Sequence, residues 1–195
     1  MTKNKIIFII FIIVALIQLY VPASMIIDRE KVLEKGVVLK IKTRPIDPTD
    51  PFRGKYIDLR YEANSIEVDS TESWIYGTDI YVVMKPDSDG FSIPAEVSKT
   101  KPDTDSPYFK AKVDGYYHYD GPPKIDIIYP FDRFYMEESK AYEAELAYRD
   151  AQWDTSQVSY AIVKVLDGQA VLQDVIIGDE SIKKIVEERL IQNKK

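Results

Sequence analysis

The chain has 195 residues, of which 45% are apolar and 12% aromatic, so its composition excludes a disordered protein. It has no cysteine and a single histidine, His118, which excludes disulfides, thiol nucleophiles, a lipidated cysteine and a multi-histidine metal site. Residues 1–27 carry two lysines and no acid, leaving 24 basic and 32 acidic groups, a net charge of −8, in the remainder. That balance argues against nucleic-acid binding and against an outer domain lying flat on an anionic membrane surface.

An apolar run occupies residues 6–27 and is interrupted by only three residues that are polar or proline. Its length reaches the ~20 residues that a helix needs to cross the hydrocarbon of a bilayer. Lys3 and Lys5 precede the run, and positive residues tend to stay on the cytoplasmic side. We therefore predict a transmembrane anchor over 1–27 in the cell membrane, with a cytoplasmic N-terminus and an extracytoplasmic domain over 28–195.

A cleaved signal peptide is the alternative reading of the same segment. Val21, Pro22 and Ala23 offer small residues after a short apolar run, as a cleavage site does. Proline next to the cut is unfavourable for that reading, and apolar residues resume immediately afterwards. The length of the run favours the uncleaved anchor, but both readings stay open at this point.

Downstream of the anchor, alternation of apolar and polar residues is the dominant pattern, and it is typical of half-buried strands. An Asp167-Gly168 pair between two such segments predicts a tight hairpin turn, and Pro94 marks a strand edge or a bulge. Fourteen tyrosines also favour strands. The predicted strands are 37–43, 55–63, 65–68, 79–85, 91–98, 108–119, 124–129, 157–166 and 169–177.

Three helical segments interrupt this pattern. Residues 28–35 continue the anchor helix until Gly36, residues 137–150 are rich in Ala, Glu and Leu, and a last helix begins at Asp179 or Ser181. The fold class is therefore mainly β (α+β): a transmembrane helix followed by a mostly antiparallel domain of about seven to nine strands with one or two packed helices.

The segment from Thr43 to Glu62 is the most distinctive part of the chain, because two Asp-Pro pairs lead into a glycine and then into a strand pattern. Prolines reduce the entropy that is lost when such a loop becomes ordered, and loops on a scaffold commonly carry binding residues. The candidate ligand- or partner-binding residues are Arg44, Asp47, Asp50, Arg53, Lys55, Asp58 and Arg60. The alternative is that these charges pair at the surface and the prolines only shape the crossover.

Residues 54–61 read Gly-Lys-Tyr-Ile-Asp-Leu-Arg-Tyr and resemble the Gly-Asp-Tyr-x-x-Leu-x-Tyr motif of the GDYXXLXY family of bacterial membrane-anchored proteins. The motif residues Gly54, Tyr56, Leu59 and Tyr61 match, whereas Lys55 replaces the aspartate. The resemblance extends to the anchor, the Asp-Pro loop and the hairpin centred on Gly168. It implies an envelope protein of uncharacterised activity, often encoded beside polytopic membrane proteins. Leu59 and Tyr61 are expected on one face of the strand and Tyr56 on the other.

Catalytic and metal sites find little support in the sequence. An anchored β-rich domain is also the plan of type I signal peptidases, which would assign a nucleophile to Ser24 and a base to Lys55, Lys110 or Lys124. No lysine lies in an apolar run that would lower its pKa. We predict no catalytic residue, metal or cofactor. The expected function is that of an accessory protein which binds a polytopic integral membrane partner through the 44–60 loop, with an envelope hydrolase as the alternative.

Overall fold

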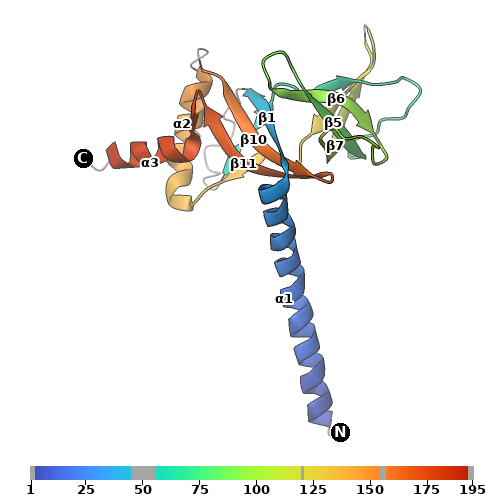
Figure 1. The fold of residues 1–195 in the computed structure, drawn as a ribbon, viewed down its shortest axis with the longest axis vertical. Coiled ribbons are helices and arrows are strands. Elements are labelled where there is room, and N and C mark those ends of the chain that lie inside the picture. Colours follow the sequence, from blue (N-terminus) through green and yellow to red (C-terminus); the bar gives the residue numbers. More distant parts are fainter. Residues whose placement is uncertain (1–2, 45–55, 120, 154–156, 193–195) are drawn as a thin grey trace.

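The structure is a computed structural model, and it describes residues 3–44, 56–119, 121–153 and 157–192. The predicted anchor lies in an N-terminal helix that projects from the rest of the molecule (Figure 1). This helix, α1, runs without interruption from Lys3 to Lys35 and contains Pro22. Every large apolar side chain from Ile6 to Ile27 is exposed.

The apolar surface of α1 has the dimensions of a membrane span. The 22 residues from Ile6 to Ile27 extend for about 33 Å, and bilayer hydrocarbon is about 30 Å thick. Among the described residues, α1 is the one helix long and apolar enough to cross a membrane. It is compatible with a single-pass anchor, and an N-terminal signal sequence would share these features.

The last turns of α1 belong to the folded domain. Val32 is only 2% exposed, and α1 contacts the hairpin of β10 (Ser159–Leu166) and β11 (Gln169–Ile177). The amide of Gly36 donates to the carbonyl of Val32 at 2.8 Å and closes the helix where the sequence predicted its end. Strand β1 (Val37–Arg44) begins at the next residue, so no flexible linker separates the helix from the domain.

The first sheet is entirely antiparallel and has the order β12-β11-β10-β1-β3, with β3 at Arg60–Tyr61 and β12 at Glu180–Ser181. The β10–β11 turn has positive φ at Asp167 (49°) and Gly168 (82°), as a primed two-residue turn requires. The predicted hairpin is therefore confirmed. Inward side chains of β1 and β10 alternate with outward ones along both strands.

The second sheet is also antiparallel and has the order β4-β8-β7-β5-β6. Pro94 lies on the edge strand, and the register shifts there so that Ala95 has no partner residue on β5. The edge and the bulge predicted from Pro94 are both present. The strands of this sheet are β4 (Ser65–Glu67), β5 (Asp79–Pro86), β6 (Ser92–Ser98), β7 (Tyr108–Tyr117) and β8 (Lys124–Ile128).

A two-stranded ladder of β2 (Tyr56–Asp58) and β9 (Arg133–Tyr135) connects the first sheet to the segment before α2. The predicted strand 55–63 is divided at Leu59 into β2 and β3, and β9 was not predicted. The described residues therefore contain twelve strands, more than the seven to nine expected. The mainly β (α+β) class and the antiparallel arrangement are confirmed.

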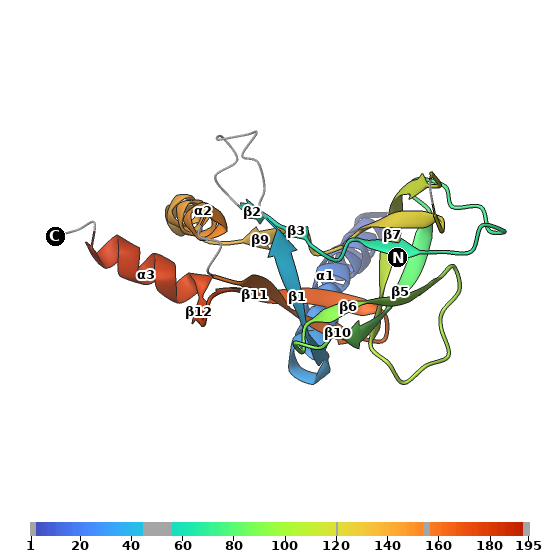
Figure 2. The same cartoon turned by 90° about the horizontal axis from the view of Figure 1, so that it is seen from above.

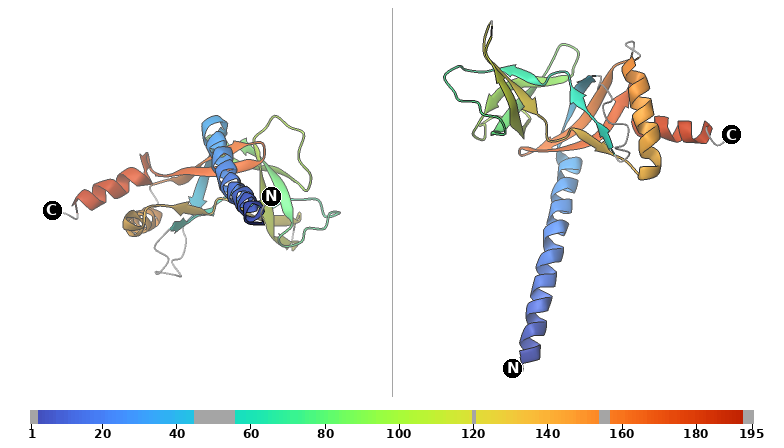
Figure 3. Two further views of the ribbon diagram at one scale, coloured as in Figure 1. Left: turned by 90° about the horizontal axis from the view of Figure 1, so that it is seen from below. Right: turned by 180° about the vertical axis from the view of Figure 1, so that it is seen from behind.

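Two further helices, α2 (Glu138–Trp153) and α3 (Ile182–Gln192), pack against each other at one end of the domain, and the second sheet lies at the other end (Figures 2 and 3). The amide of Lys183 donates to the Ser181 hydroxyl at 3.2 Å, which confirms the predicted cap of α3. Buried side chains of both sheets and both helices form one continuous core, so the two helices belong to the same folded unit as the sheets.

Gly36 offers a direct test of the linker-free junction between α1 and β1. A Cβ atom at this position would lie 2.4 Å from the Val32 carbonyl oxygen and 3.0 Å from the Val165 amide nitrogen. Both are backbone atoms, which cannot rotate away as a side chain can. We expect Gly36→Ala to lower the free energy of unfolding by about 1–3 kcal/mol, a typical cost of overpacking. Thermal denaturation of the detergent-solubilised protein measures the effect. Lys35→Ala is the control, and equal stability of both variants would show that the junction is not tightly packed.

Candidate functional site

The described residues include three of the seven predicted binding residues. Arg44 ends β1, Asp58 ends β2 and Arg60 begins β3, and all three are exposed. The remaining candidates Asp47, Asp50, Arg53 and Lys55, together with the motif residue Gly54, lie outside the described residues. The structure thus places the two ends of the predicted loop.

The described motif residues face as predicted from the sequence. Leu59 and Tyr61 are each 3% exposed and lie in the core, whereas Tyr56 is half-buried on the other side of the strand. Tyr56 lies against Tyr135, with ring centroids 5.5 Å apart, and under the guanidinium of Arg133, 4.9 Å from its ring. The motif therefore contributes both to the core and to a surface aromatic cluster.

The motif strand holds the segment between β8 and α2 by a series of polar contacts. Strands β2 and β9 pair along three residues each, and the Leu59 amide then donates to the Asp132 carbonyl at 2.7 Å. The Tyr61 hydroxyl donates to the Phe131 carbonyl, also at 2.7 Å, in a buried position. Every residue from Phe131 to Tyr135 is thus fixed by a partner in the motif strand.

An aromatic cluster surrounds the Tyr61 hydrogen bond. The Tyr61 ring lies 4.7 Å from that of Tyr129 and 5.5 Å from that of Phe131, and Phe109 packs against both of these. The Tyr129 hydroxyl donates to the Ala63 carbonyl. Burial raises the pKa of Tyr61 well above its ordinary value, so its hydroxyl stays protonated and remains a donor at neutral pH.

Arg44 and Arg60 lie directly opposite each other in the antiparallel pairing of β1 and β3. Cross-strand partners project to the same face, with Cβ atoms about 4.5–5.5 Å apart, and like charges in this arrangement are destabilising. Both side chains are exposed, and neither forms an ion pair with another described residue. The pairing therefore presents two guanidinium groups together at the point where the chain enters and leaves the predicted loop.

Arg133 is engaged within the protein, unlike that arginine pair. Its Nε lies 3.8 Å from Oδ1 of Asp58, and its guanidinium stacks on Tyr56. A hydrogen bond with the Tyr135 side chain raises the pKa of Arg133 above its ordinary value. The predicted candidate Asp58 thus contributes to the β2–β9 ladder, which is the structural role that the sequence left as an alternative.

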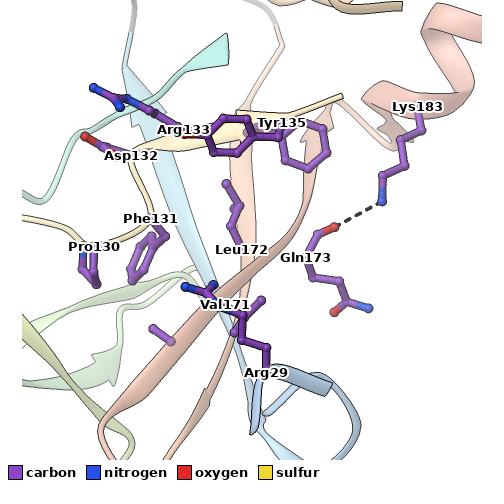
Figure 4. A pocket seen from close by; sticks show the side chains of 12 residues that line it. Arg29, Pro130, Phe131, Asp132, Arg133, Tyr135, Val171, Leu172, Gln173 and Lys183 are labelled. Carbon is purple, nitrogen blue, oxygen red and sulfur yellow. Dashed lines mark hydrogen bonds between the residues drawn. The ribbon is translucent and has the colours of Figure 1, made fainter. Parts of the chain in front are cut away.

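A cavity of about 480 Å³ lies between β9 and β11. These two strands approach each other, but among the described residues β9 pairs with β2 alone, and β11 pairs with β10 and, at its end, with β12. We call this space the β9/β11 cavity (Figure 4). Its lining residues are Arg29, Pro130, Phe131, Asp132, Arg133, Phe134, Tyr135, Ala170, Val171, Leu172, Gln173 and Lys183.

The cavity combines an apolar wall with basic groups from two helices. Arg29 extends from α1 towards β11, and Lys183 extends from α3 on the far side of Gln173 (Figure 4). The Lys183 ammonium donates to the Gln173 carbonyl at 3.2 Å. Gln173 has no partner residue on β10, because the register shifts between Ile162 and Val163, and such bulges often occur next to functional sites.

Sequence reasoning did not identify this cavity. Arg29 and Lys183 are isolated basic residues in helices at opposite ends of the chain, and the third cavity-lining base, Arg133, lies in the unpredicted strand β9. Asp132 is the one acidic residue in the lining. Only the packing of α1 and α3 on either side of β11 brings these groups to one place, so no local sequence signal could have revealed it.

The structure offers no support for the hydrolase alternative. The Ser24 hydroxyl donates to the Val21 carbonyl at 2.9 Å within α1. Lys110 stacks over the Tyr81 ring at 5.6 Å, and Lys124 pairs with Glu67 at 3.5 Å, so both ammonium groups interact within the second sheet. Lys55 lies outside the described residues. Among the described residues, no group of three or more acidic or histidine side chains could hold a metal ion.

The tyrosine contacts predict a difference between two conservative substitutions. Tyr61→Phe leaves the buried Phe131 carbonyl without its donor, whereas the buried Tyr148 hydroxyl has only a contact with the Thr43 hydroxyl to lose, and that contact lacks the geometry of a good hydrogen bond. We expect Tyr61→Phe to cost about 1–3 kcal/mol of stability and Tyr148→Phe to be neutral or stabilising. Denaturant unfolding midpoints of the two variants provide the measurement. Equal losses would show that the Tyr61 hydroxyl does not hold the segment.

Comparison of the chain with models of protein families found a match. A family model described as GDYXXLXY protein matches residues 18–175, from α1 through most of β11. Searches of curated proteins and of solved structures found no match. Because the family match covers most of the chain and includes the motif strand and the segment that it holds, this chain belongs to the GDYXXLXY family.

Proposed function

We propose that this protein is a membrane-anchored, extracytoplasmic accessory protein that binds a polytopic integral membrane partner. The observation that carries the proposal is the junction between α1 and the domain. Val32 is buried in the domain, and β1 begins directly after Gly36. An apolar helix in a membrane would therefore set both the height and the rotation of the domain, and a fixed orientation suits binding to a neighbour in the same membrane.

The proposed orientation of the protein in the membrane rests on the charges that flank the apolar run of α1. Lys3 and Lys5 precede the apolar run without an acid near them, whereas the three bases of residues 28–35 alternate with three acids. The positive-inside tendency then keeps the N-terminus in the cytoplasm and the domain outside. A domain without cysteine tolerates that location because its core includes side chains from both sheets and both helices.

The surface that we propose for the partner is the end of β1 with the adjoining loop. Arg44 and Arg60 form an unneutralised pair among the described residues, and guanidinium groups bind carboxylates with two parallel hydrogen bonds. β1 begins beside the anchor, so Arg44 lies up to about 23 Å further along the strand. We therefore assign to the partner a charged surface on an extramembrane loop, with acidic groups facing Arg44, Arg60 and Arg53 and basic groups facing Asp47 and Asp50.

Membrane attachment is tested by washing membranes that contain the full-length protein with alkaline carbonate. We expect the protein to remain in the pellet, because an apolar segment of ~20 residues inserts almost irreversibly. N-terminal sequencing of the recovered protein accompanies the wash. A soluble species that begins at Ser24 would instead identify a cleaved signal peptide and a secreted domain.

Partner binding is tested by affinity purification from detergent extracts, with the retained membrane proteins identified by mass spectrometry. We expect Arg44→Gln/Arg60→Gln to reduce retention of the partner while the melting temperature stays equal or rises, because the substitution relieves like-charge repulsion. The triple substitution of Asp47, Asp50 and Arg53 by alanine should likewise reduce retention and shift the melting temperature by no more than a few degrees.

Lys112→Gln/Lys124→Gln is the control for the loss of two positive charges, since both lysines are exposed on the second sheet, where they pair with Asp79 at 2.9 Å and Glu67 at 3.5 Å. It should leave retention of the partner unchanged. A large loss of stability in either loop variant, with the partner still bound by the folded fraction, would show that the loop is structural and would contradict the proposed surface.

A further inference from the structure

We propose that the β9/β11 cavity binds the phosphate-bearing headgroup of an anionic phospholipid from the leaflet next to the domain. The inference rests on the proposed membrane anchoring and assigns a ligand to a site other than the proposed partner surface.

The cavity lies at the level of lipid headgroups. Arg29 follows Ile27, the last residue of the apolar run, by two positions, which is about 3 Å of helix rise. The headgroup layer on each side of a bilayer is about 5–8 Å thick. With the apolar run in the hydrocarbon, the Arg29 side of the cavity therefore opens within this layer, where phosphate groups are concentrated.

The basic groups of the cavity have donors available. Arg29 forms no hydrogen bond or ion pair with any described residue, and its guanidinium has five N–H donors. Lys183 uses one of the three donors of its ammonium on the Gln173 carbonyl, so that contact orients the charge and leaves two donors. Phosphate oxygens accept charge-assisted hydrogen bonds from both kinds of group.

The local charge of the cavity is opposite to that of the domain. Its lining contains three basic residues and one acidic residue, a net charge of +2 in a chain whose total is −6. Asp132 opposes an anion, but its carboxylate and the guanidinium of Arg133 project on the side away from Lys183 (Figure 4). Arg133 is already engaged by Asp58, so Arg29 and Lys183 are the two groups assigned to the phosphate.

The apolar wall fits the part of a lipid that adjoins the phosphate. Ala170, Val171 and Leu172 of β11 are half-buried and expose apolar surface to the cavity, whereas Phe131 and Phe134 are each only 4% exposed and contribute little accessible surface. A free inorganic anion has no apolar surface to bury against this wall, whereas the glycerol backbone and first methylene groups of a phospholipid can pack on it. A volume of about 480 Å³ is within the usual range for ligand pockets.

The experiment uses full-length protein in neutral detergent micelles, titrated with short-chain phosphatidylglycerol, short-chain phosphatidylcholine or inorganic phosphate alone, with bound ligand measured by native mass spectrometry. We expect selective binding of phosphatidylglycerol. Arg29→Gln/Lys183→Gln should weaken it by about tenfold or more, because it removes two charge-assisted contacts. Both side chains are exposed, so the variant should keep the wild-type melting temperature.

Lys31→Gln/Lys184→Gln is the matched control, since it removes two exposed positive charges from the same two helices without altering the cavity lining. If both double variants weaken phosphatidylglycerol binding equally, the effect depends only on the overall charge of the protein, and the proposal is overturned. The proposal would also be overturned if inorganic phosphate bound as tightly as phosphatidylglycerol. It would likewise be overturned if Arg29→Gln/Lys183→Gln lost a bound polypeptide instead of a bound lipid.

The two proposals fail in different ways. Release of the wild-type protein by carbonate would remove the anchor and, with it, the placement of the cavity in the headgroup layer. A protein that stays in the membrane and shows no preference for phosphatidylglycerol would contradict the cavity proposal alone. Partner retention by Arg29→Gln/Lys183→Gln is expected to be unchanged, since the proposed partner surface includes neither residue.

Discussion

The contacts between the motif strand and residues 131–135 are the constraint on which the rest of the domain depends. The Leu59 amide and the Tyr61 hydroxyl each donate to a carbonyl of this segment, and β2 pairs with its remaining residues. A buried carbonyl without a donor costs about 1–3 kcal/mol, so these bonds are difficult to replace individually. The spacing of leucine and tyrosine in the motif thus has two consequences. It places both side chains in the core, and it provides hydrogen-bond donors for the backbone carbonyls of the neighbouring segment.

This constraint also connects the motif to the β9/β11 cavity. Residues 130–135 form one wall of the cavity, and β11 forms the other, against which α1 packs. The motif strand fixes the first wall, and the linker-free junction after Val32 fixes the anchor against the second. The described motif residues therefore hold one wall of the cavity, although none of them belongs to its lining.

Local patterns in the sequence predicted the elements whose determinants are local. The alternation in β1 and β10, the Asp167-Gly168 turn and the Ser181 cap all depend on neighbours within a few residues. β9 was missed because three residues are too few to show alternation. The strand 55–63 is divided at Leu59 because the chain changes its pairing partner there, from β9 to β1. The cavity was missed for the same reason, since only tertiary packing brings Arg29 and Lys183 to the same cavity.

The net charge of the domain and the local charge of the cavity act over different distances. The screening length at physiological salt is about 8 Å, so acids far from the anchor contribute little to the potential at the lipid surface. Arg29 lies within the headgroup layer in the proposed orientation, where a basic group near an anionic surface contributes about 1 kcal/mol. In the proposed orientation, the acidic surface of the domain opposes contact with an anionic membrane, while Arg29 at its base is close enough to the lipid surface to be attracted to it. The combination favours a domain that stands upright on its anchor and keeps the Arg44–Arg60 pair accessible to a neighbouring protein.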